Sequence, residues 1–352
     1  MDTSSHREVR SLEPTHTLAE YVSALATALT TDGPALGCGP VHSKSVRSDI
    51  SLLVATSGST GNPKEIAISS SALLSSATAS NKYLGAKQGD SWSLLLPLTH
   101  IAGINVLLRS LQLKSSPVDL RNHVGTYPHA DFTAIVPTQL FNALNENSDL
   151  LKHLQGAKAV LVGGASLSQE LRTQGMDAGI NIITTYGMSE TCGGCIYDGV
   201  PLDGVAFEII PDGRIKISGN VLADVETNDG WFITQDLGKI IDGKLHVIGR
   251  SDDVIISGGE NISLSAVEKE INKKFPDLLV SAFATNDSKW GQALHVAAQT
   301  QDENLKAQIS DVLVKSIGTH AKPKSVIVLD KLPLIGVGKV DRISLAKLVN
   351  ES

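Results

Sequence analysis

The apolar and polar positions along the chain predict a first region built from alternating strands and helices. Short apolar runs, which are typical of buried strands, lie at Ile50–Val54, Ser91–Pro97, Phe132–Pro137, Lys158–Gly164 and Asn181–Gly187. Stretches with helical spacing separate these runs, and an earlier stretch at Thr17–Leu29 also has helical spacing. The alternation predicts an α/β sheet that is covered by helices on both faces.

The pattern changes twice beyond this region. From about Val205 the chain has short strand-like runs joined by Asp-Gly pairs, which predict hairpins and a small attached β element. After Arg250, Ser265 and Glu268 stand at capping-box spacing at the start of a predicted helix, and two strand candidates and a second helix follow. These elements predict a compact α+β unit of about 100 residues. We therefore expect an N-terminal domain over 1–250 and a smaller C-terminal domain over 251–352.

The composition narrows the classes of partner. The chain has 352 residues, of which 41% are hydrophobic and 19% are charged, and its formal net charge is −7. These values fit a soluble protein with a sizeable core, and the negative charge argues against a nucleic-acid partner. No apolar run approaches the roughly 18 residues of a membrane helix, and residues 1–10 lack the apolar core of a signal peptide. Without such segments we expect no membrane insertion. Because three cysteines are a low and odd number, we expect a reducing compartment and therefore a cytoplasmic location.

The stretch Ala55–Glu65, ATSGSTGNPKE, has the composition of a phosphate-binding loop. Its glycines allow backbone N–H groups to turn toward an anion, the hydroxyl groups of Ser57, Ser59 and Thr60 add donors, and Lys64 adds a positive charge. It matches neither the G-x-x-x-x-G-K-[ST] loop of nucleotide hydrolases nor the G-x-G-x-x-G loop of dinucleotide-binding proteins. Taken alone, the stretch fits a surface turn after a strand equally well.

Further motifs follow this loop, and together they resemble the adenylate-forming superfamily of acyl-CoA synthetases, luciferases and peptide-synthetase adenylation domains. After the loop they are LPLTHIAG at Leu96–Gly103, TTYGMSET at Thr184–Thr191, WFITQDLG at Trp231–Gly238, GRSDDVIISGGENIS at Gly249–Ser263 and LPLIGVGKVDR at Leu332–Arg342. They occur in the order of that family and extend over all but roughly the first 50 residues. The resemblance implies a large N-terminal α/β domain and a small, mobile α+β C-terminal domain.

The resemblance also implies an acid–thiol ligase that uses ATP, Mg²⁺ and CoA. Members of the family form an acyl-adenylate from a carboxylic acid and ATP, release pyrophosphate, and then let the CoA thiol displace AMP. The segments His100–Leu111 and Tyr186–Val205 resemble the short o-succinylbenzoate–CoA ligases of menaquinone biosynthesis. A ligase for another aryl or acyl acid, a stand-alone adenylation domain that loads a carrier protein, and an inactive nucleotide-binding relative stay open as alternatives. The sequence also leaves open whether the chain works as a homodimer.

The motifs assign a set of residues to the nucleotide by resemblance. These residues are Ser57, Ser59, Thr60, Lys64, Gly163, Gly164, Ala165, Tyr186, Gly187, Ser189, Asp236 and Arg250. The loop residues should hold the β- and γ-phosphates, and Tyr186 should stack on the adenine. The two carboxylate oxygens of Asp236 can accept hydrogen bonds from both ribose hydroxyls. Glu190 should coordinate Mg²⁺, a hard cation that favours carboxylate oxygen.

Further residues are assigned to catalysis and to the change between half-reactions. The resemblance makes Lys339, Thr60, Glu190 and His100 the residues nearest the chemistry. Lys339 should bridge the acid and the α-phosphate, where its charge can stabilise the transition state. Asp252 matches the family's hinge, about which the C-terminal domain turns between the two half-reactions. After that turn the adjacent Gly258 and Gly259 should line the pantetheine channel.

The acid pocket is assigned to residues of two motifs. We interpret His100 as a wall and gate of this pocket rather than a general base. Asn105 and Arg109 follow on a helical pattern, and Arg109 could balance a second carboxylate of the acid or lie solvated at the surface. Gly193 and Gly194 would open room for a flat aromatic acid.

A few residues depart from the family pattern or invite another chemistry. Glu65 stands where the family usually has Gly, and its charge near phosphate is unfavourable unless the side chain points away. Gln235 replaces the Gly that usually precedes the ribose-binding Asp, which leaves the local backbone path open. Cys192 and Cys195 form a C-x-x-C pair, but with Cys38 as the only other cysteine they cannot make a four-cysteine site.

Overall fold

The computed structural model describes residues 5–13, 15–30, 33–56, 64–276, 278–335 and 339–350, and for Asp252, Ile335 and Lys339 it describes the backbone alone. The chain separates into two compact units. Unit 1 comprises residues 1–208, 216–233 and 240–245, and unit 2 comprises residues 209–215, 234–239 and 246–352. The domain bounds of 1–250 and 251–352 expected from the sequence stay a prediction.

Unit 1 begins with a five-stranded sheet in the order β3-β1-β2-β4-β5. Its strands are β1 (His6–Ser11), β2 (Ala35–Cys38), β3 (Ser45–Arg47), β4 (Ile50–Thr56) and β5 (Lys64–Ser69). Strands β1, β2 and β4 run parallel, and the chain then returns antiparallel along β5. Helix α1 (Leu18–Leu29) packs against β2 and β4, and Thr17 begins it with a capping box to Glu20.

The second sheet of unit 1 has the order β12-β11-β10-β9-β8-β6-β7. Its strands are β6 (Trp92–Leu94), β7 (Val118–Asp119), β8 (Phe132–Ile135), β9 (Ala159–Val162), β10 (Ile182–Met188), β11 (Gly193–Tyr197) and β12 (Val200–Pro201). The strands from β7 to β10 are parallel, and β11 pairs antiparallel with β10. The predicted strands are confirmed as β4, β6, β8, β9 and β10.

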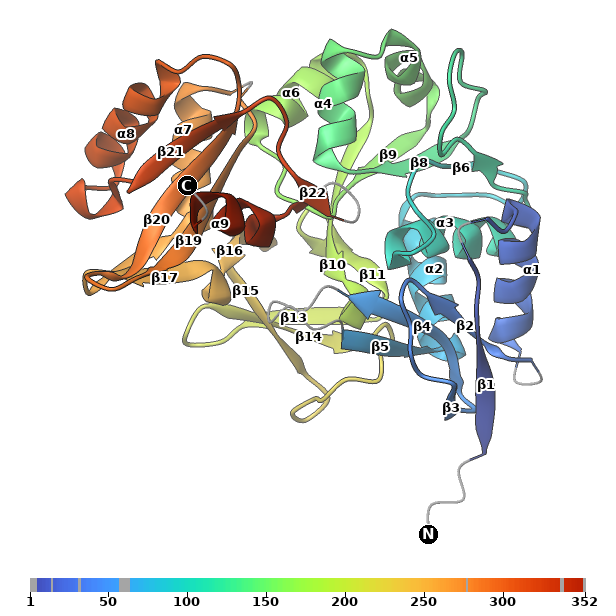
Figure 1. Ribbon diagram of the computed structural model, residues 1–352. Helices are drawn as coiled ribbons and strands as arrows, with labels where there is room; N and C mark the ends of the chain where they lie inside the picture. The colour runs from blue at the N-terminus through green and yellow to red at the C-terminus, as the bar shows by residue number, and fades with distance from the viewer. Residues whose placement is uncertain are drawn as a thin grey trace. The chain divides into compact units, whose positions relative to one another are not determined.

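Helices cover both faces of this second sheet. They are α2 (Ser70–Tyr83), α3 (Ile101–Gln112), α4 (Pro137–Asn145), α5 (Ser148–Gly156) and α6 (Gln169–Asp177). Figure 1 shows α4, α5 and α6 on one side of β8 and β9, and α2 and α3 on the other. Buried Leu140 and Leu154 pack with Val160 of β9 and Ile182 of β10 in one core, which confirms the predicted α/β architecture. No helix in the described ranges combines the length and the apolar content needed to cross a bilayer.

A four-stranded sheet follows, with the order β13-β14-β15-β16. Its strands are β13 (Val205–Ile209), β14 (Arg214–Gly219), β15 (Phe232–Ile241) and β16 (Lys244–Arg250). Asp242 and Gly243, with φ of 51° and 72°, form the turn between β15 and β16. Because both residues have positive φ, this turn has the geometry that an Asp-Gly hairpin predicts.

The C-terminal part of unit 2 is an α+β layer. Its elements are η2 (Ser251–Asp253), β17 (Val254–Ser257), β18 (Glu260–Ser263), α7 (Leu264–Lys274), β19 (Val280–Asp287), β20 (Gly291–Gln299), α8 (Leu305–Ser316), η3 (Thr319–Ala321), β21 (Ser325–Leu329), β22 (Leu334–Ile335), β23 (Lys339–Val340) and α9 (Arg342–Asn350). In β20, Val296 packs in the core with α7 and α8, whereas its neighbour Ala297 packs in a second core with Leu345 of α9. Since successive strand residues point to opposite faces, helices cover both faces of this sheet as well.

The predicted start of α7 is wrong in its capping residue. The N-cap is Ser263, whose side chain accepts a hydrogen bond from the Ala266 N–H, so Ser265 lies inside the helix. Glu268 therefore does not complete a capping box. Its carboxylate instead accepts a hydrogen bond from the Ala282 N–H at 2.8 Å and pairs with Arg342.

Candidate functional site

The predicted phosphate loop joins the antiparallel strands β4 and β5. Thr56 ends β4 and Lys64 begins β5, and the Thr56 hydroxyl donates to the Lys64 carbonyl at 3.0 Å. The Lys64 side chain is exposed. Ser57, Ser59 and Thr60 lie outside the described residues, so their roles stay a prediction.

Glu65 is turned toward the segment before β4. Its carboxylate accepts hydrogen bonds from the Ser43 hydroxyl, at 2.5 Å, and from the His42 N–H. Partial burial opposes the charged form of Glu65, but these hydrogen bonds hold the pKa of its carboxyl below the ordinary value. The negative charge at this unusual position is thus bound by donors of the chain itself.

The YGMSE motif forms the end of β10 and the short helix η1 (Ser189–Thr191), which contacts β5. The Ala223 N–H donates to the Glu190 carbonyl at 2.9 Å, and the next N–H, that of Asp224, donates to Ala67 of β5 at 2.8 Å. These bonds link the strand after the phosphate loop to the segment that carries Ser189 and Glu190. The structure therefore brings two of the predicted nucleotide motifs together within unit 1.

Close backbone packing explains several glycines of these motifs. A Cβ on Gly163 would lie 2.1 Å from the Thr185 hydroxyl, so the turn after β9 passes directly beside β10. A Cβ on Gly187 would lie 1.9 Å from the Gly193 carbonyl oxygen across the β10–β11 pair. Side chains at either position would separate strands that the site needs side by side. Gly164, Ala165 and Tyr186 continue these segments as predicted, and their contacts with a nucleotide stay a prediction.

Buried polar side chains of α2 and α3 hold the turn between η1 and β11. Cys192 has a left-handed φ of 54°, which is uncommon for a residue with a side chain. Its carbonyl accepts hydrogen bonds from Asn105 at 2.8 Å and from Ser76 at 3.3 Å. A Cβ on Gly193 would lie 2.4 Å from the Asn105 amide nitrogen, so this glycine leaves room for Asn105. That Gly193 and Gly194 also leave room for an aromatic acid stays a prediction.

Arg109 is buried on α3, with 4% of its surface exposed. Its Nη2 donates to the Tyr197 hydroxyl at 3.1 Å, and its guanidinium lies 4.8 Å from the centre of the Trp92 ring. Its Nε is buried without a partner, as is the Asn105 Oδ1 one helical turn earlier. No carboxylate among the described residues pairs with Arg109. The alternative of a solvated surface arginine is therefore wrong.

His100 is the N-cap residue of α3, and its side chain makes no capping hydrogen bond. Its backbone carbonyl accepts from the Ile104 N–H at 3.2 Å. The position at the start of α3, directly after the loop that follows β6, places His100 beside the helix that carries Asn105 and Arg109. Its role as a wall of an acid pocket stays a prediction.

Asp236 and Arg250 belong to unit 2, where they form an ion pair of 3.1 Å. Asp236 is buried on β15, and Arg250 ends β16 with about half of its side chain exposed. The antiparallel pairing of these two strands thus brings the two predicted ribose ligands together. The Ser251 hydroxyl lies within hydrogen-bond distance of the Gln235 backbone carbonyl, at 3.0 Å, and of its side-chain Oε1, at 2.8 Å. These contacts fix the backbone beside Asp236.

The remaining predicted residues lie in the α+β layer of unit 2. Gly258 and Gly259 form the turn between β17 and β18 with φ of 60° and 88°, and a Cβ on Gly258 would lie 2.7 Å from the Trp290 ring. Asp252 lies in η2, and Lys339 begins β23 opposite Ile335. The side chains of Asp252 and Lys339 are outside the described part of the chain.

The cysteines are buried thiols. Burial raises the pKa of Cys38 and of Cys195 to about 12, and it also raises the pKa of Cys192. Their thiolate forms are therefore disfavoured at neutral pH. Within the described ranges, no group of three or more His, Cys, Asp or Glu side chains is placed to hold a metal ion.

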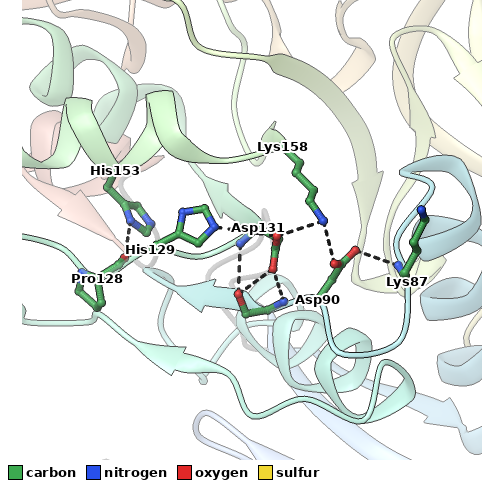
Figure 2. A network of polar contacts seen from close by, with 8 residues as sticks. Lys87, Asp90, Pro128, His129, Asp131, His153 and Lys158 are labelled. Atoms are coloured by element: carbon green, nitrogen blue, oxygen red, sulfur yellow. Dashed lines mark hydrogen bonds and ion pairs between the residues drawn. The ribbon is translucent and has the colours of Figure 1, made fainter.

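A polar network outside the predicted site lies at the other ends of the parallel strands. Figure 2 shows Lys158 between two carboxylates, with its Nζ 2.7 Å from Asp90 and 3.1 Å from Asp131. These three residues precede β9, β6 and β8, whereas the predicted site residues follow the carboxyl ends of β6, β9 and β10. The carboxyl ends of such strands are where ligands bind in open α/β sheets.

Sequence reasoning missed the side chains that support the site. Ser76 and Thr191 bind groups that are far away in sequence or hidden in a turn, and no local pattern marks them. Thr191, for example, accepts from the Met188 N–H at 2.9 Å and donates to the Gly193 carbonyl at 2.8 Å, which closes the turn around Glu190.

Known proteins resemble this chain in sequence and in fold. A "Probable 2-succinylbenzoate--CoA ligase" of Mycobacterium tuberculosis is 34% identical over 94% of this chain and 95% of its own length. A "2-succinylbenzoate--CoA ligase" of Listeria monocytogenes is 27% identical over 82% of this chain and 68% of its own length. The solved O-succinylbenzoate coenzyme A synthetase from Bacillus subtilis, in complex with ATP and magnesium ion, has a TM-score of 0.71 at 22% identity and covers 95% of this chain and 83% of its own.

The fold is also that of ATP-bound MatB from Rhodopseudomonas palustris, with a TM-score of 0.74 at 19% identity over 97% of this chain and 83% of that one. The family model described as AMP-binding enzyme matches residues 3–226, which span β1 to the segment before β15. That range contains the β4–β5 hairpin, η1 and α3. The chain belongs to the family of AMP-binding enzymes.

Proposed function

We propose that this chain is an ATP-dependent acid–CoA ligase that works through an acyl-adenylate, and that its acid is 2-succinylbenzoate. The similarity to ligases named for 2-succinylbenzoate supports this assignment, and so does the order of the motifs. In this proposal residues 1–250 bind ATP and the acid, and residues 251–352 bring Lys339 to the nucleotide. The chain would use cytoplasmic ATP and CoA.

Arg109 is the observation that carries the choice of a dicarboxylic acid. A buried cation without a carboxylate partner is costly, because water no longer solvates it and no opposite charge replaces the water. A substrate with a second carboxylate would supply that charge, and the partnerless Nε can donate to a carboxylate oxygen as one arm of the guanidinium fork. A monocarboxylic acid would leave Arg109 unpaired.

Glu190 has the chemistry required of a Mg²⁺ ligand. Its carboxylate is half-buried and binds no group of the described residues, so its oxygens remain available to a hard cation. Mg²⁺ at this place would neutralise phosphate charge during the attack of the acid. In this proposal the hydrogen bonds of Thr191 and of the Glu190 carbonyl hold the Glu190 carboxylate near the strand that follows the phosphate loop.

The other site residues orient the two substrates. Ser57, Ser59, Thr60 and Lys64 would hold the β- and γ-phosphates, and Tyr186 would cover the adenine beside the turn Gly163–Ala165. Asp236 and Arg250 would bind the ribose, and His100 would separate the acid from the route of the pantetheine arm. Lys339 would stabilise charge that develops between the acid and the α-phosphate. Gly258 and Gly259 would replace it after rotation about Asp252.

A panel of acids tests the proposal. We expect pyrophosphate release with 2-succinylbenzoate and ATP, and formation of AMP and a CoA thioester when CoA is added. Benzoate, which lacks the second carboxylate, should be a much poorer substrate than 2-succinylbenzoate. Acceptance of a carrier protein but not of free CoA would favour an adenylation domain instead. Absence of pyrophosphate release with every acid would refute the proposal.

A Lys339→Ala variant separates the half-reactions. We expect it to lose acyl-adenylate formation and to retain most of the thioester formation from supplied acyl-adenylate and CoA, because Lys339 acts in the first step alone. Pyrophosphate release and thioester absorbance measure the two steps independently. Equal loss of both would contradict the proposed role.

A further inference from the structure

Three charged side chains join distant segments inside unit 2. The Arg342 guanidinium binds Asp253 through Nη1, and its Nη2 lies 2.9 Å from the Glu268 carboxylate. The three side chains are largely buried, with exposed fractions of 34% for Arg342, 25% for Glu268 and 12% for Asp253. A guanidinium held by two carboxylates has a fixed orientation, because its donors form a rigid fork.

In the group of Arg342, Asp253 and Glu268, here called the triad, two members lie near predicted functional residues along the chain. Asp253 follows the predicted hinge residue Asp252 directly, and both lie in η2. Arg342 is the first residue of α9, three residues after Lys339, and three residues span at most about 11 Å. The triad thus connects the residue next to the hinge to the segment that carries the predicted catalytic lysine.

Hydrogen bonds also hold the described residues on both sides of Lys339. The Asp341 N–H donates to the Pro333 carbonyl at 2.8 Å, and Leu334 pairs with Val340 across β22 and β23. The Asp341 carboxylate caps α9 by accepting from the N–H groups of Ile343 and Ser344, both at 3.1 Å. Strands β22 and β23 are therefore joined to the start of α9, and the ionic contact of Arg342 orients these described residues.

Glu268 connects these residues to the core of the layer. Its Oε1 accepts both the Arg342 donor and the Ala282 N–H of β19 at 2.8 Å. The carboxylate lies on α7, whose Val267 and Ile271 are fully buried in the main core of the layer. Arg342 is thus oriented by a rigid helix on one side and by the hinge-proximal Asp253 on the other.

We propose that Arg342 is a positioning residue for Lys339: held by Asp253 and Glu268, it sets the orientation of the lysine hairpin relative to the hinge. The inference rests on the proposed function, because it assumes that Lys339 acts in acyl-adenylate formation. A rotation that begins at Asp252 then reaches Lys339 through a fixed ionic contact rather than through a loose hairpin. The consequence is specific, because only the half-reaction that uses Lys339 depends on this orientation.

The test compares the two half-reactions in an Arg342→Lys variant of the full chain. Lysine keeps the positive charge but lacks the fork that reaches both carboxylates. Because misplacement of a reacting group by about 1 Å can cost about 100-fold, we expect acyl-adenylate formation to fall by about 10- to 100-fold. Thioester formation from supplied acyl-adenylate should stay within about twofold, since the misplaced group, Lys339, takes no part in that step.

Two further variants address the alternative that the triad merely supports folding. Glu268→Gln keeps the shape and an acceptor for the Ala282 N–H, and it should give a smaller loss confined to the same half-reaction. Lys306→Gln removes a surface ion pair between Lys306 of α8 and Glu303, which precedes the helix, and it should change neither step. Equal loss of both half-reactions in Arg342→Lys, or no loss in either, would overturn the inference.

A double variant shows whether Arg342 acts through Lys339. If it does, adding Arg342→Lys to Lys339→Ala causes no further loss of the residual acyl-adenylate formation, because residues that act as a unit are not additive. A full additional loss would overturn the inference. A wild-type chain that is inactive with every acid would overturn the proposed function and this inference together, whereas an active wild type matched by Arg342→Lys overturns the inference alone.

Discussion

The contact between Gly187 and the β10–β11 turn predicts a large effect from one added methyl group. In Gly187→Ala the new Cβ would lie 1.9 Å from the Gly193 carbonyl oxygen, 2.6 Å from its carbon and 2.7 Å from the Gly194 Cα. All three obstacles are backbone atoms, so no side-chain rotation relieves the clash. To reach an ordinary contact distance of about 3.5 Å, the two strands would have to separate by roughly 1.5 Å.

The magnitude follows from the cost of overpacking. Inserting a methylene into a packed region typically costs about 1–3 kcal/mol, and a backbone obstacle places Gly187→Ala at the upper end. For a unit of the size of unit 1, a loss of about 3 kcal/mol lowers the melting temperature by about 6–12 °C. The same displacement moves Glu190, three residues further along, so we also expect pyrophosphate release to fall by about 100-fold.

Thermal unfolding and pyrophosphate release of the purified variant measure both effects. Gly156→Ala is a matched control, because a Cβ there lies 3.8 Å from its nearest neighbour, His129 Nδ1, at the end of α5. The control should melt at or slightly above the wild-type temperature, since Ala favours a helix over Gly. If Gly187→Ala melts within about 2 °C of the wild type, in which case less than about 1 kcal/mol is lost, the β10–β11 pairing described above is wrong.

Two further predictions concern buried groups. Thiol reagents should modify the native chain very slowly and the urea-unfolded chain at once, because burial raises the pKa values of all three thiols, those of Cys38, Cys192 and Cys195. Burial also lowers the pKa of His295, whose ring bonds Thr285 and Ser325 at 2.9 Å and 2.8 Å, below the ordinary 6.5. Because the folded state favours the neutral His295 ring, its full contribution to stability should be present above about pH 6.5 and should be lost as the pH drops through the lowered pKa. The urea midpoint of unfolding should therefore fall between pH 7 and pH 5, and the His295→Gln variant should show a smaller fall.

The sequence predicted the elements whose signal is local. The buried strands β4, β6, β8, β9 and β10 are apolar runs, and the family follows from short motifs in a fixed order; the fold and the family are confirmed. The early strands were not predicted, because β1 has a single buried side chain, Arg7, and β3 has only three residues. Their places in the sheet come from the pairing of β1 with β2 and of β3 with β1, which a local pattern does not encode.

The roles of individual polar residues depended on distant partners. The sequence placed Asn105 in an acid pocket, and its amide holds the Cys192 carbonyl, 87 residues away. Ser263 rather than Ser265 begins α7, because both serines fit a cap locally and tertiary contacts of Glu268 decide between them. A sequence motif therefore predicts the location of a site more reliably than it predicts the role of each side chain in that site.

Two cations on neighbouring aromatic rings have opposite environments and predict opposite effects. Arg109 lies 4.8 Å from the Trp92 ring and Lys158 lies 5.9 Å from the Phe132 ring, while the two rings are 5.2 Å apart. Lys158 is half-exposed and held by Asp90 and Asp131, as Figure 2 shows, so Lys158→Met should lower the free energy of unfolding only slightly and leave activity unchanged.

Arg109 is buried without a carboxylate among the described residues, and its partner Tyr197 keeps a second hydrogen bond to Ser80 at 2.8 Å. Arg109→Met removes an unpaired charge from the interior, so stability should stay the same or rise by about 1 kcal/mol. If the second carboxylate of the acid binds there, the KM for 2-succinylbenzoate should rise by about 30-fold or more, while the KM for ATP stays constant. Loss of stability without a change in the KM for the acid would mean that Arg109 is a structural cation, and the case for a dicarboxylic substrate would fail.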